Sequence, residues 1–163
     1  MRADPKPASS PEDIEKLIQK TRSYCAYQER GHEEVFQKLK RAGLSNSSCD
    51  QIISQLISEG YINESRFAIL YAGGKFRIKK WGKIKIELSL RQKKVSPYNI
   101  KAALSAIDSK DYRKTLEKIL EDKIESFKGL KLPVKKHKAA QYAISRGFEA
   151  EMVWGILAMS YEL

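Results

Sequence analysis

The chain has 163 residues, and 42% of them are hydrophobic, which is enough to form a core in one domain or in a few small repeats. This composition excludes a disordered chain. Its formal net charge of +11 favours polyanionic partners: nucleic acid, an anionic membrane surface or an acidic protein. The opening residues contain no apolar run of signal-peptide length, and the longest uncharged apolar segment, residues 152–161, is shorter than the roughly 20 residues of a spanning helix. We therefore expect a soluble, cytoplasmic protein without a membrane segment.

The chain begins with a segment that does not show helical periodicity. Residues 1–10 contain two prolines and two serines, so they are predicted to form a flexible tail. Order is expected to begin at Ser10, because Ser10 can cap a helix and Pro11 suits the first helical position. We expect this helix to end at Gly31 in a left-handed turn.

Two more helices are predicted in the first sixty residues. One covers about 33–42 and stops at Gly43. Another starts at Ser48, which has the spacing of a capping box with Gln51, and stops at Gly60.

The middle of the chain repeats this succession of three helices. Asn63 is expected to cap a helix that reaches about residue 78, a second helix covers about 81–93, and Ser96 followed by Pro97 starts a third. The last third of the chain shows the pattern again. An apolar stripe at helical spacing runs from 112 to 127, Pro133 starts a helix that ends at Gly147, and Phe148 leads into a final helix.

Apolar residues share one spacing in the second helix of each unit, at offsets of 51 and 53 residues. The three sets are Val35, Leu39 and Leu44; Ile86, Leu90 and Val95; and Ala139, Ala143 and Phe148. A period near 50 predicts an all-α fold of three tandem three-helix repeats that form a short curved solenoid, each unit burying apolar faces partly on its neighbours. The predicted repeats cover residues 11–60, 61–108 and 109–163. The alternative is an irregular helical bundle whose internal similarity is accidental.

Residues 83–90 alternate between polar and apolar residues, which by itself favours a strand. We predict a helix, because no other run offers a strand partner and the corresponding segments of the other units have helical spacing. Ile86 and Leu90 then share one face, while Ile84 and Leu88 share nearly the opposite one. This second apolar face either packs between two repeats, which we favour, or forms an exposed strip that faces a protein partner.

A basic run occupies residues 75–94, where nine lysines and arginines face a single acid, Glu87. Such runs are often only solvated faces, but this density favours contact with a polyanion. Phe76 and Trp81 are candidate stacking groups for bases, although aromatic residues at helix ends more often belong to the core. The predicted contacts to DNA or to a DNA-containing filament are Lys75, Arg77, Lys79, Lys80, Lys83, Lys85, Arg91, Lys93 and Lys94. Candidate secondary contacts are Lys131, Lys135, Lys136 and Lys138.

Nothing in the sequence predicts a metal, a cofactor or a catalytic site. Cys25 and Cys49 lack the spacing of a metal site, and in a reducing compartment we expect two small, partly buried thiols rather than a disulfide. Residues 32–36 fail the HExxH template, His137 has no nearby carboxylate, and no GxxxxGK[ST] loop is present to hold a phosphate. We therefore expect a protein that is not an enzyme.

The middle unit combines the helix start at residues 63–68, Tyr71, and the run Gly82-x2-Lys85-Ile86-x3-Leu90-x4-Val95. In these features it resembles the RecX family of regulators of the bacterial recombinase RecA. Matching spacings in the first unit extend this resemblance over roughly residues 14–157. The chain departs from the family's pattern in three places: Gly73-Gly74 stands inside the helix, Asn63-Glu64 stands where two acids are common, and Lys94 replaces a glycine.

The resemblance implies a non-enzymatic, cytoplasmic protein of recombination and DNA repair that acts as a monomer. Such a protein binds the RecA–DNA filament along its groove and restrains strand exchange and filament growth. An extended helical-repeat surface with a basic middle unit is compatible with that partner and with single- or double-stranded DNA. The alternative is a stand-alone helical nucleic-acid-binding module that acts through its basic middle repeat.

Overall fold

The computed structural model describes residue 8 and residues 10–160, and this part of the chain is all-α. The predicted tail, residues 1–10, lies almost entirely outside the described residues. Among those described, no helix is both long enough and apolar enough to cross a membrane. The helices are α1 (Pro11–Tyr27), α2 (His32–Arg41), α3 (Asn46–Ser58), α4 (Glu64–Lys79), α5 (Lys83–Gln92), α6 (Pro97–Ser105), α7 (Ser109–Ser126), α8 (Leu132–Ser145) and α9 (Ala150–Ser160).

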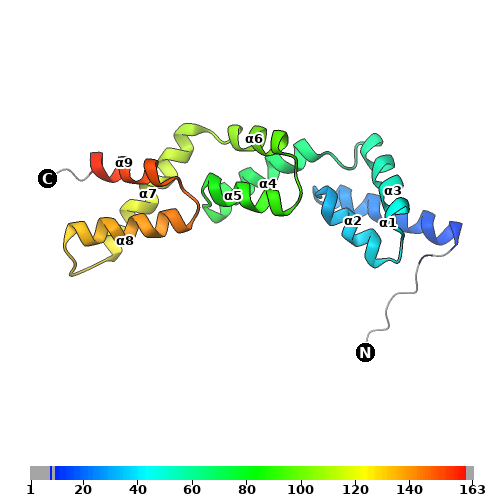
Figure 1. Cartoon of the computed structure of the whole chain (residues 1–163), viewed down its shortest axis with the longest axis horizontal. Helices are drawn as coiled ribbons and strands as arrows, with labels where there is room; N and C mark the ends of the chain where they lie inside the picture. The colour runs from blue at the N-terminus through cyan, green and yellow to red at the C-terminus, as the bar shows by residue number, and fades with distance from the viewer. Residues whose placement is uncertain (1–7, 9, 161–163) are drawn as a thin grey trace, which may run out of the picture.

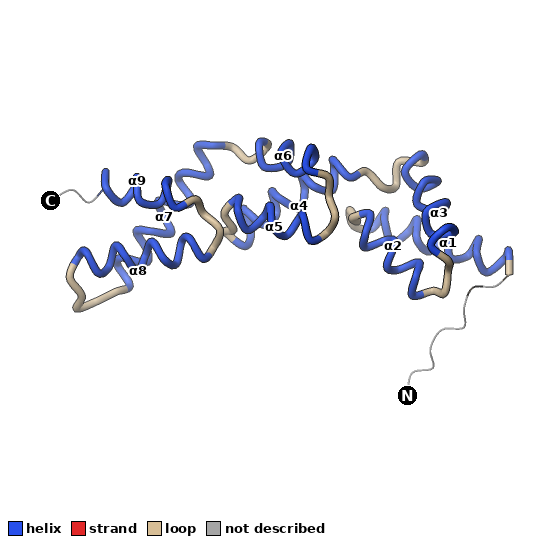
Figure 2. Tube along the Cα trace, in the orientation of Figure 1, coloured by secondary structure: helices blue, strands red, loops and turns tan. Residues whose placement is uncertain are grey.

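The helices form an elongated row of three groups (Figure 1). The first unit (α1–α3) lies at one end, the middle unit (α4–α6) at the centre and the third unit (α7–α9) at the other end, and loops alone join the helices in the described part (Figure 2). The predicted all-α solenoid of three-helix repeats is confirmed. The residue limits of the repeats stay a prediction.

Local signals place most helix starts where the sequence predicts them. The side chains of Ser10, Asn63 and Ser96 each accept a hydrogen bond from the backbone amide three residues later, which satisfies one of the free amides of the first turn. Left-handed turns at Gly43 and Gly60 follow α2 and α3, as expected from glycine's freedom at positive φ.

Two helix boundaries were predicted wrongly. Gly31 does not end α1, which stops at Tyr27; it has a φ of −73° and is the N-cap of α2. A Cβ at this position would lie 3.1 Å from the Phe67 ring, so a larger residue would require the ring to shift by a few tenths of an ångström. The second error concerns α3, which is capped by Ser45 rather than Ser48 and so begins three residues earlier. The hydroxyl of Ser45 accepts from the backbone amide of Ser48 at 3.2 Å.

Residues 83–90 lie in α5, the second helix of the middle unit, so the prediction of helix over strand for this segment is confirmed. Ile86 and Leu90 are fully buried, while Ile84 and Leu88 are 53% and 57% exposed. The favoured expectation that this second face packs between repeats is therefore wrong. The third unit reaches α5 through the backbone, where the Ile84 amide donates to the Gly147 carbonyl at 3.0 Å, and leaves the outer side chains uncovered.

The core is divided in two. Buried residues of the first unit, among them Leu39 and Leu56, form one cluster. A second cluster runs through the middle and third units from Phe67 to Leu157. The expectation that every unit shares apolar faces with its neighbours thus holds for the middle and third units and is wrong for the first.

The two junctions between units differ in chemistry. Two ion pairs join the first unit to the middle one, Arg66 with Glu29 at 2.7 Å and Lys94 with Glu33 at 3.3 Å. Backbone contact joins the middle unit to the third, where the Gly82 amide donates to a carbonyl of the turn after α8 at 2.8 Å. The first junction is therefore mainly polar and the second is closely packed.

Candidate nucleic-acid interface

Three lysines of the basic run gather around two aromatic rings of the middle unit. The Lys75 ammonium lies 5.4 Å from the ring centre of Tyr71 and 4.8 Å from that of Trp81. The Lys85 ammonium lies 4.7 Å from the Trp81 ring, and the Lys93 ammonium lies 5.4 Å from the Tyr71 ring. We call these five residues the aromatic–lysine cluster.

Helix geometry explains why these residues meet. Tyr71 and Lys75 are four residues apart on α4, so they share one face. Lys85 lies on α5 and Lys93 just beyond its end, eight residues later and therefore on one side of that helix. The short connection between α4 and α5 contains Trp81. The two faces are held together by a hydrogen bond between the Tyr71 hydroxyl and the Ser89 hydroxyl.

The aromatic–lysine cluster has the chemistry of a phosphate-binding face. The rings hold the ammonium groups by cation–π attraction, which leaves their charge uncompensated by any carboxylate contact found among the described residues. Three fixed cations on one face can neutralise phosphates of a nucleic-acid backbone and release its counterions. Flat rings beside them add surface on which a base can stack.

The structure places four other predicted contacts outside the cluster. Lys94 pairs with Glu33 across the first junction, Arg91 pairs with Glu87 at 2.8 Å, and the Lys83 ammonium lies 4.9 Å from the ring centre of another residue, Tyr112. Arg77 also lies apart. Its guanidinium bends back over Gly73 on α4.

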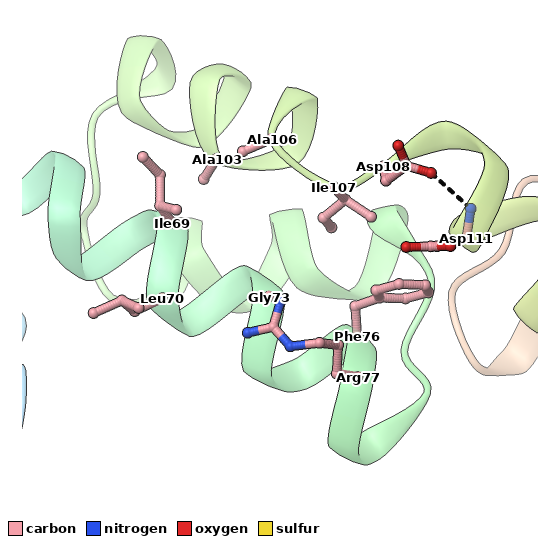
Figure 3. A pocket seen from close by; sticks show the side chains of 10 residues that line it. All are labelled: Ile69, Leu70, Gly73, Phe76, Arg77, Ala103, Ala106, Ile107, Asp108 and Asp111. Atoms are coloured by element: carbon pink, nitrogen blue, oxygen red, sulfur yellow. Dashed lines mark hydrogen bonds between the residues drawn. The ribbon is translucent and has the colours of Figure 1, made fainter.

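Arg77 belongs to a cleft of about 350 Å³ between α4, α6 and the start of α7 (Figure 3). Apolar side chains form much of its lining, and the figure shows Arg77 beside Gly73 and the Asp108 carboxylate accepting from the Asp111 amide at the far end. The lining residues are Ile69, Leu70, Gly73, Phe76, Arg77, Ala103, Ala106, Ile107, Asp108 and Asp111. Arg77 thus points to a different surface from Lys75.

The remaining basic candidates are spread over the surface. Lys79 and Lys80 are exposed at the end of α4, and Lys80 has a left-handed backbone with a φ of 56°. Four more lysines lie in or next to α8 of the third unit, where the Lys138 ammonium is 5.7 Å from the Phe127 ring centre. The predicted secondary contacts on α8 are Lys131, Lys135, Lys136 and Lys138.

The aromatic candidates divide between core and surface. Phe76 is buried, which confirms its assignment to the core, and its ring lies 5.6 Å from that of Tyr112. Trp81 is half-buried beside the lysines. Sequence reasoning gave Tyr71 no role in the site, although its spacing of four from Lys75 on a predicted helix was a signal that could have found it.

The two cysteines are free and, unlike the partly buried thiols that the sequence predicts, both are buried; burial raises the pKa of both thiols. Among the residues that the structure describes, no group of three or more His, Cys, Asp or Glu side chains is placed to bind a metal ion.

Fold and surface together define a helical-repeat protein with a cationic, aromatic middle unit. Residues 63–104, which include this unit's cluster, match the family described as "RecX, second three-helix domain". The fold is also that of a solved structure, RecX from Lactobacillus salivarius, with a TM-score of 0.84 at 23% identity over 92% of this chain and 97% of that one.

Sequence relatives agree with this match. A "Regulatory protein RecX" of Clostridium tetani is 31% identical over 128 residues, which are 76% of this chain and 57% of the relative. Another from Lactobacillus gasseri is 27% identical over 152 residues, which are 88% of this chain and 56% of the relative. The predicted resemblance to the RecX family is therefore confirmed in sequence and fold. The chain spans about half the length of the curated relatives it matches.

Proposed function

We propose that this protein is a RecX-type regulator that binds the RecA recombinase–DNA filament and inhibits strand exchange and filament growth. One observation carries the proposal: the residues that match the second RecX domain are the same residues that bring three lysines and two rings to one face. The protein acts by binding, as a cytoplasmic monomer without cofactor or catalysis. The naming of its relatives as regulatory proteins supports the regulatory part of this proposal.

The role of the aromatic–lysine cluster is to contact phosphates of the DNA held in the filament. Lysine ammonium groups on flexible stems act as point charges, so they recognise a backbone without reading its sequence. The elongated row of units supplies further surface to the protein part of the filament (Figure 1). Binding to the DNA and to the protein part of the filament at the same time would hinder the exchange of strands and the addition of recombinase subunits.

A second candidate function is a stand-alone nucleic-acid-binding module. The half-buried Trp81 ring favours it, because a ring flanked by two lysines is a platform on which a single-stranded base can stack. The two functions predict different partners. The module binds naked DNA best, whereas the regulator binds best to the assembled filament.

Co-sedimentation distinguishes the two functions. The full chain is mixed with RecA alone, with single-stranded DNA alone, and with RecA filaments assembled on that DNA, at near-physiological salt. We expect the largest fraction to sediment with the filament, together with slower strand exchange. Equal sedimentation with naked DNA and with filament would favour the module over the regulator.

A further inference from the structure

An apolar strip is exposed on the outer face of α5. Ile84 and Leu88 are one helical turn apart, and more than half of each side chain is open to solvent. The opposite face of the helix is buried through Ile86 and Leu90. We call Ile84 and Leu88 the α5 strip, and it adds little to the core of the protein.

Comparison of the repeats shows that the fold does not require apolar residues at these positions. The offsets that superimpose the buried residues place Glu33 and Gln37 of the first unit, and His137 and Gln141 of the third unit, at the positions of the α5 strip. All four are polar. Gln37, His137 and Gln141 are exposed, and Glu33 pairs with a lysine. The middle unit alone carries apolar side chains there.

The surroundings of the α5 strip are cationic. Leu88 is flanked three residues before by Lys85 and three residues after by Arg91. Glu87, the only acid of α5, pairs with Arg91 at 2.8 Å, so Lys85, whose ammonium lies 4.7 Å from the Trp81 ring centre, is the flanking cation that a partner's carboxylate can meet. Helix α8 of the neighbouring third unit contains no acidic residue. An apolar strip within a positive field therefore selects a ligand that is both apolar and negatively charged.

We infer that the α5 strip is the docking site of an acidic, amphipathic helical segment of a partner protein. Apolar side chains of the segment would cover Ile84 and Leu88, and a flanking carboxylate would face Lys85. A second copy of this chain is a poor occupant, because two α5 helices would bring like charges together. The inference goes beyond the proposed function, since it assigns a protein contact made by apolar side chains, which shares only Lys85 with the aromatic–lysine cluster.

The test uses two labelled synthetic peptides and the full chain. Both peptides have leucines at positions i, i+4, i+7 and i+11; one carries glutamates at most other positions and the other carries lysines. Fluorescence anisotropy should show that the acidic peptide binds. The double change Ile84→Gln and Leu88→Gln, which keeps the net charge, should weaken binding by about tenfold or more, because the apolar contact is lost.

A matched control is Val134→Gln, which removes another exposed apolar side chain, 43% exposed on α8, and should leave binding unchanged. Because all three positions are exposed, circular dichroism should show the same helical content in every variant. Three outcomes would overturn the inference: equal binding of both peptides, unchanged binding by the double variant, or self-association of the wild type that the double variant loses. None of these measurements uses RecA, so a failure of this inference can be told apart from a failure of the proposed function.

Discussion

Gly82 and Gly147 are where the middle and third units come into closest contact. A Cβ on Gly82 would lie 2.1 Å from the backbone carbon of Gly147, and a Cβ on Gly147 would lie 2.4 Å from the Cβ of Lys85. The same junction is completed by Tyr112, whose hydroxyl accepts from the Lys83 amide at 3.0 Å and donates to the Glu149 carboxylate. Burial, together with Glu149, raises the pKa of this phenol, so it remains a donor.

Replacing Gly82 by alanine should therefore destabilise the protein, because the three atoms nearest to the new methyl group are backbone atoms of Gly147 and Phe148 that cannot move aside. We expect a loss of about 1–3 kcal/mol in the free energy of unfolding, measured by urea denaturation. Gly74→Ala is the matched control, since no atom lies within 4 Å of its Cβ position in α4. It should be neutral or stabilising by up to about 1 kcal/mol. Equal effects of both changes would contradict the packed junction.

At the scale of the helices, an ion pair links α1 to the end of α3. The guanidinium of Arg22 on α1 binds both carboxylate oxygens of Glu59 at the end of α3, at 2.8 Å each. This hydrogen-bonded pair, with help from Gln55, lowers the pKa of Glu59 to about 2. Because the folded pKa lies below the ordinary value, the pair's stabilisation is present above about pH 4.5 and is lost as the pH falls towards 2.

Arg22→Ala should raise the pKa of Glu59 towards its ordinary value. In a carboxyl-carbon NMR titration, Glu59 of the wild type should remain mostly ionised at pH 3, while Glu59 of the variant should be mostly protonated. The variant Arg113→Ala breaks a different exposed pair, with Glu117 on α7, and should leave the Glu59 titration unchanged. A Glu59 pKa that stays near 2 after Arg22→Ala would show that the pair is not the cause.

Helix boundaries show which parts of the fold were predictable. The caps at Asn63 and Ser96 are local, since a side chain and an amide three residues away decide them, and they could be found from sequence. Gly31 was misjudged because its role depends on Phe67, which is distant in sequence. Ser45 was missed because several hydroxyls compete within a few residues.

The candidate site, like the helix boundaries, could be predicted from the sequence only in part. The density of charge in residues 75–94 is a property of the sequence, but which cations share a face depends on helix register and on the fold of the connection at Trp81. Lys75 lies with the rings, whereas Arg77, two residues later, turns over Gly73 on another side of α4. The exposure of the α5 strip could not be predicted either, because it depends on how far neighbouring units reach.

The whole molecule combines two units that share one hydrophobic core with a first unit that has its own core. The middle and third units share apolar packing, while Arg66 and Lys94 carry ion pairs to the first unit. The aromatic–lysine cluster lies in the shared part, where its geometry is held by the packing of α4 against α5 and α6. We propose that this cluster contacts DNA within a filament whose protein surface the other units also bind.

That claim is tested most directly by a salt series that compares inhibition of RecA strand exchange with binding to naked single-stranded DNA. The joint variant Lys75→Ala, Lys85→Ala and Lys93→Ala should flatten the slope of log K against log salt on naked DNA by about 2, at about 0.7 per lost phosphate contact. The variant Lys101→Ala, Lys110→Ala and Lys114→Ala removes the same charge from exposed positions of α6 and α7 and should change that slope much less.

We expect that wild-type inhibition persists at salt concentrations that abolish binding to naked DNA, and that the cluster variant loses more affinity for naked DNA than for the filament. If inhibition and naked-DNA binding instead fall together with rising salt and with the cluster substitutions, competition for DNA explains the inhibition and the protein is not a filament regulator.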